Sequence, residues 1–182
     1  MRRLVQLFAL IASAVLLAAM MVTTPDFNSS FRAIPTYVES GGEGQTRLVK
    51  GRFLDWQIAD RIVLQGRSEQ TMFDTQGKFL IADLEVGGVQ ASTVMDATWI
   101  GASGRQYFAD TRIPAYQGGL KGLWLQPGLT DKARVIFELP PDEIAGGRLK
   151  LGWSVEIPLE GILILDPPAH PPAEVAEVEV RE

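Results

Sequence analysis

Apolar and polar residues alternate with a period of two in three segments of the chain, residues 78–86, 132–140 and 148–157. Because successive side chains of a β-strand point to opposite faces, this alternation predicts three strands that each bury one face. The residues predicted to point into a core are Leu80, Ala82, Leu84, Val86, Ala133, Val135, Phe137, Leu139, Leu149, Leu151, Trp153, Val155 and Ile157.

Turn residues separate further strand-like segments, and the clearest turns are Gly101–Gly104 and Pro127–Gly128. A third turn is predicted at Asp74–Gly77. Segment 47–65 is interpreted as two strands or as one long bent strand, because its alternation is imperfect. No helical period follows Val22, so the pattern predicts an all-β fold, an antiparallel β-sandwich of seven to eight strands. The remaining predicted strands span residues 93–100, 105–108, 123–125 and 162–165.

A continuous apolar segment, Leu4–Val22, follows Arg2 and Arg3 near the N-terminus. As a helix it spans about 28 Å, close to the roughly 30 Å hydrocarbon core of a bilayer. Positive flanks stay in the cytoplasm, so the part after the helix should be extracytoplasmic. An uncleaved signal anchor is favoured over a cleaved signal peptide, because the segment is long and lacks an Ala-x-Ala site at its end. We therefore expect a single-pass protein of a bacterial cytoplasmic membrane, with a periplasmic or external domain.

The prediction divides the chain into five parts with different compositions. Proline and glycine before the first strand indicate a tether, and the Pro-, Ala- and Glu-rich C-terminus is typical of a disordered acidic tail. The parts are a cytoplasmic basic flank (1–3), a transmembrane signal anchor (4–22), a tether (23–46), the β-sandwich (47–166) and the disordered tail (167–182).

Charge and cysteine content exclude several classes of function. Without Arg2 and Arg3 the chain has 15 basic and 22 acidic residues, a net charge of −7, which disfavours binding to a phosphate backbone. No nucleic-acid partner is therefore expected. The chain has no cysteine, which excludes disulfides, thiolate metal sites and a cysteine nucleophile.

The residues that most often carry catalysis do not form a recognisable set in the sequence. The single histidine, His170, lies in the Pro-rich tail, where fixed partners are not expected. The carboxylate pairs Asp83 with Glu85 and Asp142 with Glu143 fit a solvated strand face and a turn better than a catalytic pair across a cleft. We predict no catalytic residue and no cofactor.

Aspartates in the loops of a β-sandwich are the candidates for a metal site. Asp74, Asp110 and Asp131 are the three considered for Ca²⁺. They do not follow the alternating Asp-x-Asp-x-Asp pattern of a calcium loop, so no metal site is predicted.

Aromatic residues are the best candidates for a binding surface. Trp99 and Trp153 are in phase with inward residues and are assigned to the core, whereas Trp124 is out of phase with its neighbours. Exposed aromatic side chains in one place indicate a binding surface. The alternative is that this loop folds back over an open end of the sandwich. The predicted partner-binding surface consists of Tyr107, Phe108, Tyr116 and Trp124.

Four motifs occur in a characteristic order: a strand after Gly77–Lys78, a hairpin around 104–107, the turn Leu125–Gly128 and the strand Val135–Pro140. Over residues 58–151 this order resembles the bacterial extracytoplasmic immunoglobulin-like domains of unknown function. Their fold is similar to that of a secreted immunoglobulin-like mycobacterial antigen. The resemblance implies an immunoglobulin-like sandwich outside the cytoplasm, carried behind a signal peptide, lipid anchor or membrane helix. It implies no catalytic residues.

Together these observations predict a membrane-anchored extracytoplasmic binding module without catalytic activity. Its expected partners are the membrane, through the N-terminal helix, and a protein or envelope component. An alternative is an accessory or assembly subunit of an envelope complex, with Ala9, Ala12, Ser13 and Ala14 allowing close packing of helices. An envelope hydrolase is disfavoured, because no nucleophile and base are found together.

Overall fold

The computed structural model describes residues 2–24, 32–109, 111–153 and 159–182. The chain forms two compact units, Met1–Arg32 and Ala33–Glu182, which are described separately.

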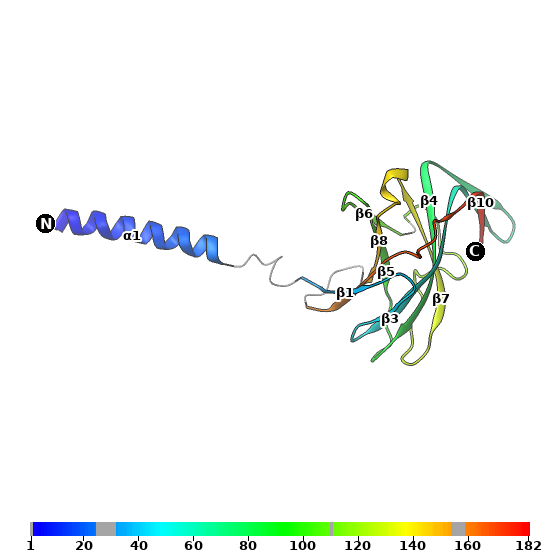
Figure 1. Cartoon of the computed structure of the whole chain (residues 1–182), viewed down its shortest axis with the longest axis horizontal. Helices are drawn as coiled ribbons and strands as arrows, with labels where there is room; N and C mark the ends of the chain where they lie inside the picture. Colours follow the sequence, from blue (N-terminus) through cyan, green and yellow to red (C-terminus); the bar gives the residue numbers. More distant parts are fainter. Residues whose placement is uncertain (1, 25–31, 110, 154–158) are drawn as a thin grey trace. The chain divides into compact units, whose positions relative to one another are not determined.

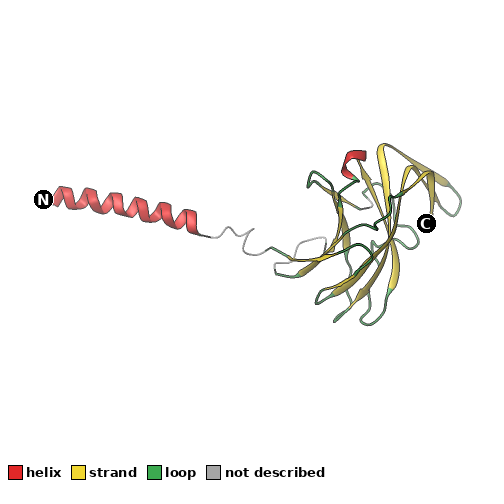
Figure 2. Cartoon of the chain, viewed as in Figure 1, coloured by secondary structure: helices red, strands yellow, loops and turns green. Residues whose placement is uncertain are grey.

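The first unit contains one helix, α1 (Arg2–Thr23), drawn as the coiled ribbon in Figures 1 and 2. None of its 22 residues is buried within the structure, although most are apolar. Near its C-terminal end the hydroxyl groups of Thr23 and Thr24 donate to the carbonyls of Ala19 and Met20. The helix is long and apolar enough to cross a membrane, and a signal sequence has the same properties.

The second unit is a β-sandwich of two sheets, as the sequence pattern predicts (Figure 2). The strand order is β1-β9-β8-β5-β6 in the first sheet and β10-β3-β4-β7 in the second, with β2 paired to β3. Figure 1 shows β5, β6 and β8 on one side of the domain and β4, β7 and β10 on the other. The strands are β1 (Ile34–Val38), β2 (Glu43–Gln45), β3 (Val49–Gln65), β4 (Gln70–Gly88), β5 (Asp96–Ile100), β6 (Gln106–Phe108), β7 (Asp131–Leu139), β8 (Arg148–Gly152), β9 (Gly161–Leu165) and β10 (Ala173–Arg181).

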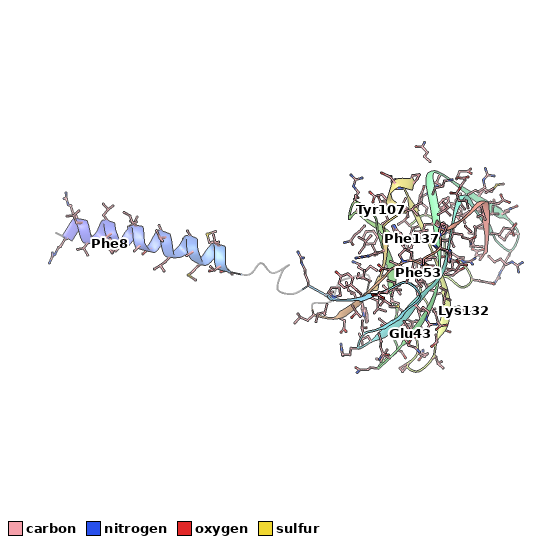
Figure 3. The ribbon with its side chains drawn as sticks, in the orientation of Figure 1. Phe8, Glu43, Phe53, Tyr107, Lys132 and Phe137 are labelled. Atoms are coloured by element: carbon pink, nitrogen blue, oxygen red, sulfur yellow. The ribbon has the colours of Figure 1, made fainter. Side chains whose placement is uncertain are left out.

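The main hydrophobic core lies between the two sheets and contains the inward residues that alternation predicts on β4, β7 and the described part of β8. Trp99 is fully buried, and its ring centroid lies 6.2 Å from those of both Trp56 and Phe137. Figure 3 shows Phe53 and Phe137 inside the domain. Aromatic pairs at this spacing add about 0.5–1.5 kcal/mol each beyond the area they bury, so this group anchors the core.

Most of segment 47–65 forms one long irregular strand, β3 (Val49–Gln65), which pairs along its length with β4. The predicted turn Asp74–Gly77 is wrong, because these residues lie within β4. The polar and glycine residues there form a bulge: Ala59 pairs with Phe79 and Arg61 with Asp74, so four residues oppose one. The chain reverses instead after Gly66, whose N–H donates to the carbonyl of Glu69.

A second hydrophobic cluster covers part of the outer face of the second sheet. Phe79, Ile81 and Ile136 point outward from β4 and β7, and side chains of the loop before β7 and of β10 cover them. The buried members of the cluster are Ala59, Ile62, Leu64, Phe79, Ile81, Ile113, Tyr116, Ile136, Val178 and Val180.

The predicted disorder of residues 167–182 is wrong, because this segment contains β10, which pairs in parallel with β3. Val178 and Val180 are buried and alternate with exposed glutamates, which is the pattern of an edge strand. The indole N–H of Trp56 donates to the carbonyl of His170 at 2.9 Å. This bond fixes the segment that leads into β10. Disorder was predicted because the segment is rich in Pro, Ala and Glu, and this composition masked the short alternation around Val178 and Val180.

The predicted tether also ends earlier than residue 46. Strand β1 pairs in parallel with β9, and β2 pairs with β3, so both belong to the sandwich. Val38 packs in the main core, and any side chain at Gly44 would collide with it. The compact domain therefore begins at Ala33.

Two shorter predicted strands differ from the structure. β8 ends at Gly152 rather than at residue 157, and the predicted inward residues Val155 and Ile157 lie outside the described residues. Trp153 is half-buried and is not part of either core cluster. Segment 123–125 forms only an isolated bridge, between Thr93 and Leu125.

Candidate functional site

The four aromatic residues predicted as one binding surface lie in different surroundings. Phe108 and Trp124 are exposed, at 61% and 63% of their surface. Tyr107 is half-buried and packs against the main core. Tyr116 is buried, so its assignment to an exposed surface is wrong.

Tyr116 fastens its loop to the second sheet. Its ring belongs to the second hydrophobic cluster, and its hydroxyl donates to the carbonyl of Arg134 at 3.0 Å. The N–H of Arg134 donates to the carbonyl of Gly118, and the N–H of Leu120 donates to that of Arg134. The alternative prediction was a loop folded back over an open end of the sandwich; this part of the loop does fold back, but onto the outer face of the second sheet.

Phe108 lines a groove of about 260 Å³ at the edge of the first sheet, beside the end of β6. Two of its apolar lining residues, Ala97 on β5 and Val135 on β7, come from different sheets and belong to the main core. The groove is lined by Asp96, Ala97, Thr98, Phe108, Ala109, Leu120, Lys121, Val135, Lys150 and Trp153.

Strand register brings three of these residues side by side. Phe108 on β6 is paired with Thr98 on β5, and Thr98 is paired with Lys150 on β8. Residues paired across a sheet point to the same face, which here is the outer face of the first sheet. Trp153 follows the end of β8 and adds a second aromatic ring to the lining.

Two lysines and one aspartate supply the charges of the groove. Lys121 is exposed, and Lys150 and Asp96 are half-buried. The ammonium group of Lys150 donates to the amide oxygen of Gln106 at 3.3 Å, which places this cation beside β6. Among the described residues, the lining thus combines two lysines with one aspartate.

Sequence reasoning found Phe108 but missed the rest of the groove. The alternation on β8 did predict that Lys150 lies on the outer face, and this was the signal from which Lys150 could have been identified as a groove residue. The pairing of β5 with both β6 and β8 places Lys150 near Phe108, and that pairing joins residues 42 positions apart. Trp153 was assigned inward because the strand was predicted to continue to residue 157.

Glu143, one of the carboxylates considered for catalysis, is a buried structural group. Its carboxylate accepts hydrogen bonds from the N–H of Ser103 at 3.0 Å and from the Ser103 hydroxyl at 2.5 Å. These bonds, helped by Arg105 and Tyr107, hold the pKa of Glu143 below its usual value despite burial. Its backbone carbonyl accepts from the indole N–H of Trp99 at 2.9 Å. Glu143 thus fastens the β5–β6 hairpin to the core.

The two acids of the other carboxylate pair lie opposite basic residues of β7. Asp83 accepts two hydrogen bonds from Arg134, at 2.7 and 2.9 Å, and these bonds raise the pKa of the arginine. Glu85 is paired in register with Lys132. Both acids follow the outer face of the second sheet, as the alternation predicts.

A second buried carboxylate, Glu160, also has a structural role. It accepts from Arg47 and from the N–H of Gly161, and the bond from Arg47 lowers the pKa of Glu160 most. His170 is exposed, with its Nε2 3.5 Å from a carboxylate oxygen of Asp55. The backbone carbonyl of His170 accepts the hydrogen bond from the indole N–H of Trp56.

The aspartates considered for Ca²⁺ do not come together in the part of the chain that the structure describes. There, no three His, Cys, Asp or Glu side chains are grouped closely enough to hold a metal ion. Asp74 accepts from Arg61 at 2.7 Å. Asp110 lies outside the described residues.

Two packed sheets with an aromatic inter-sheet core, preceded by an apolar helix, define the fold class of this protein as an immunoglobulin-like β-sandwich with one apolar N-terminal helix. The crystal structure of MPT63, a secreted protein from Mycobacterium tuberculosis, has this fold. It matches 74% of this chain and 99% of its own, with a TM-score of 0.51 and 15% identity. The predicted resemblance is confirmed at the level of the fold.

A second solved structure is more distant. It is an uncharacterized β-sandwich protein from Clostridium difficile 630, matched over 72% of this chain and 95% of its own, with a TM-score of 0.43 and 10% identity. No protein-family model and no curated protein matches the chain.

Proposed function

We propose that the protein is a membrane-anchored extracytoplasmic binding module without catalytic activity. The observation that carries this proposal is an apolar helix, flanked by Arg2 and Arg3, joined to a sandwich whose buried acids are engaged in structural bonds. The arginines favour a cytoplasmic N-terminus, and the helix has the length of a membrane span.

The surroundings of the acidic groups support a role in binding rather than catalysis. A general acid needs a carboxyl whose pKa is raised toward neutrality, as burial without partners would do. Glu143 and Glu160 are the buried carboxylates among the described residues, and hydrogen bonds lower the pKa of each. Both are therefore anions that hold loops in place.

The test is partner capture from native membranes. Full-length protein with a photo-cross-linking amino acid at Phe108 should give a defined adduct with a protein or envelope component. The same amino acid at Met72, an exposed apolar residue near the turn between β3 and β4, is the matched control. An adduct specific to position 108 supports the proposal, and identical patterns at both positions would contradict a defined binding surface.

Replacing Leu4–Val22 with an unrelated apolar helix distinguishes the accessory-subunit alternative. Under the proposal the adduct persists, because the domain makes the contact. If the adduct disappears while the protein stays in the membrane, the helix itself contacts the partner. Turnover of an envelope polymer by the purified full-length protein, lost on substitution of an acidic residue, would contradict a non-catalytic role.

A further inference from the structure

We propose that the loops at one end of the sandwich contact the lipid surface of the membrane that α1 anchors the protein to. This inference goes beyond the proposed function and rests on its anchoring helix, because it gives the domain a membrane contact of its own. It combines the place where the chain enters the domain, the loops beside that place and the apolar side chains that they expose.

The turn before β3 lies beside the point where the chain enters the domain. Ile34, the first residue of β1, donates its N–H to the carbonyl of Glu160 at 2.8 Å. The next residue, Gly161, begins β9 and lies so close to Thr46 that any side chain there would collide with it. Thr46 belongs to the turn between β2 and β3, so that turn adjoins the start of β1.

The same end of the domain contains the loop between β4 and β5 and the loop before β7. Val49 pairs with Gly88, and the N–H of Val89 donates to the carbonyl of Leu48, so the end of β4 adjoins the turn before β3. The N–H of Gly128 donates in turn to the carbonyl of Gly88. Figure 1 shows the start of β3, the end of β4 and the start of β7 together at the lower end of the domain.

Two large apolar side chains are exposed on the loop before β7. Trp124 and Leu129 are exposed at 63% and 58% of their surface, and Ile34 at 55%. Leu125 is fully buried and exchanges two backbone hydrogen bonds with Thr93, at 2.8 and 3.0 Å. The loop is therefore fixed to the domain while the side chains of Trp124 and Leu129 remain in water.

Chain connectivity favours a lipid surface as the partner of this end. Ten residues, 24–33, separate the end of α1 at Thr23 from Ile34, and a chain of this length spans at most about 40 Å. An anchored helix therefore keeps the bilayer at a high effective concentration beside these loops. Tryptophan is enriched at membrane–water interfaces, and leucine gains free energy when it leaves water, so both residue types suit this partner.

The experiment uses full-length protein in phosphatidylcholine nanodiscs, with a fluorescent dye on a single introduced cysteine. Ala91→Cys places the dye in the exposed loop between β4 and β5, beside Ser92, whose hydroxyl donates to the side-chain oxygen of Gln126 at 2.7 Å. Ser68→Cys, in the exposed turn at the opposite end of β3, is the control. A nitroxide-labelled lipid quenches a dye that reaches the bilayer. We expect quenching at position 91 and none at position 68.

Substitutions in the Ala91→Cys protein test whether the exposed side chains make the contact. Trp124→Ser and Leu129→Ser should each lower the ratio of lipid-contacting to water-exposed dye roughly tenfold, because one large apolar side chain no longer leaves water. Met72→Ser is the matched control, since Met72 is as exposed as Leu129, at 58%, but lies near the turn between β3 and β4. It should leave the ratio unchanged. Thermal melts exclude unfolding of each variant.

Equal quenching at positions 91 and 68, or quenching at 91 that neither substitution reduces, would overturn the assignment. A dye at 91 that is shielded from water but not quenched by the lipid would also overturn it, because a second copy or another protein would then cover the loops. If position 91 is not quenched but the protein stays in the nanodisc and the cross-linker at position 108 captures a defined partner, this inference fails and the proposed function stands. If α1 does not hold the protein in the nanodisc, both fail.

Discussion

At the scale of single residues, the buried carboxylates hold loops against the core of the sandwich. Glu143, in the short helical turn before β8, accepts two bonds from Ser103 in the β5–β6 turn and one, at its backbone carbonyl, from the indole N–H of Trp99 on β5. Glycine is required at position 101, since any side chain there would collide with the Glu143 carboxylate. The Glu143 side chain is therefore packed directly against the backbone of the β5–β6 turn.

Glu143 should make stability depend on pH in the acid range. Its folded pKa is depressed, so its contribution is fully present above the unfolded value of about 4.3 and is lost as the pH falls through the folded pKa. We expect Glu143→Gln to lower the melting temperature at pH 7 and to flatten the decline below about pH 4.3. Thermal melts at a series of pH values measure both effects.

The neighbouring acid provides the control for this measurement. Asp142 precedes Glu143 in the same turn but is exposed. The Asp142→Asn variant should follow the wild-type pH dependence. If Glu143→Gln also follows it, the bonds to Ser103 do not stabilise the folded state.

At the scale of elements, the last strand completes the second hydrophobic cluster. β10 pairs with β3 over almost its whole length and places Val178 and Val180 against Ile62 and Leu64. The loop before β7 covers the same cluster with Tyr116, and the N–H of Gln117 donates to the carbonyl of Arg181. Two segments distant in sequence are thus fixed to each other over one face of the sheet.

This arrangement predicts a large loss of stability from one substitution and almost none from the same substitution at a nearby position. Val178→Asp buries a charge in the cluster and should lower the free energy of unfolding by more than about 2 kcal/mol. Ala176→Asp adds the same charge at an exposed position of the same strand and should change it by about 0.5 kcal/mol or less. Urea unfolding of the full-length protein in detergent, followed by tryptophan fluorescence, compares the two. Equal stability would mean that the tail is not part of the domain.

At the scale of the whole molecule, alternation within the sequence predicts most of the inter-sheet core. The period-two pattern identifies the buried faces of β4, β7 and β8, because a strand with one buried face must alternate. It cannot place polar residues that form bulges, so Asp74–Gly77 was assigned to a turn. It also did not identify β10, because only two buried residues, Val178 and Val180, alternate there within an acidic segment.

The candidate site was harder to predict because it depends on pairing between strands. Phe108 was identified from its loop, but Lys150 and Trp153 reach the groove only through the order β6-β5-β8 in the first sheet. Tyr116 was misassigned because a loop that folds back onto a sheet leaves no periodic signal. In this fold, local pattern determines the core, and long-range pairing determines the groove.

The central claim, that the helix anchors an extracytoplasmic domain, is tested most directly by cysteine labelling in intact cells. The chain has no cysteine, so Ser68→Cys in the exposed turn between β3 and β4 and Arg2→Cys at the N-terminus give single, unambiguous sites. A maleimide reagent that cannot cross the cytoplasmic membrane should label position 68 in a full-length, membrane-bound protein. Position 2 should react only after the membrane is permeabilised. Protection of position 68, or labelling of position 2 in intact cells, would contradict the proposed topology.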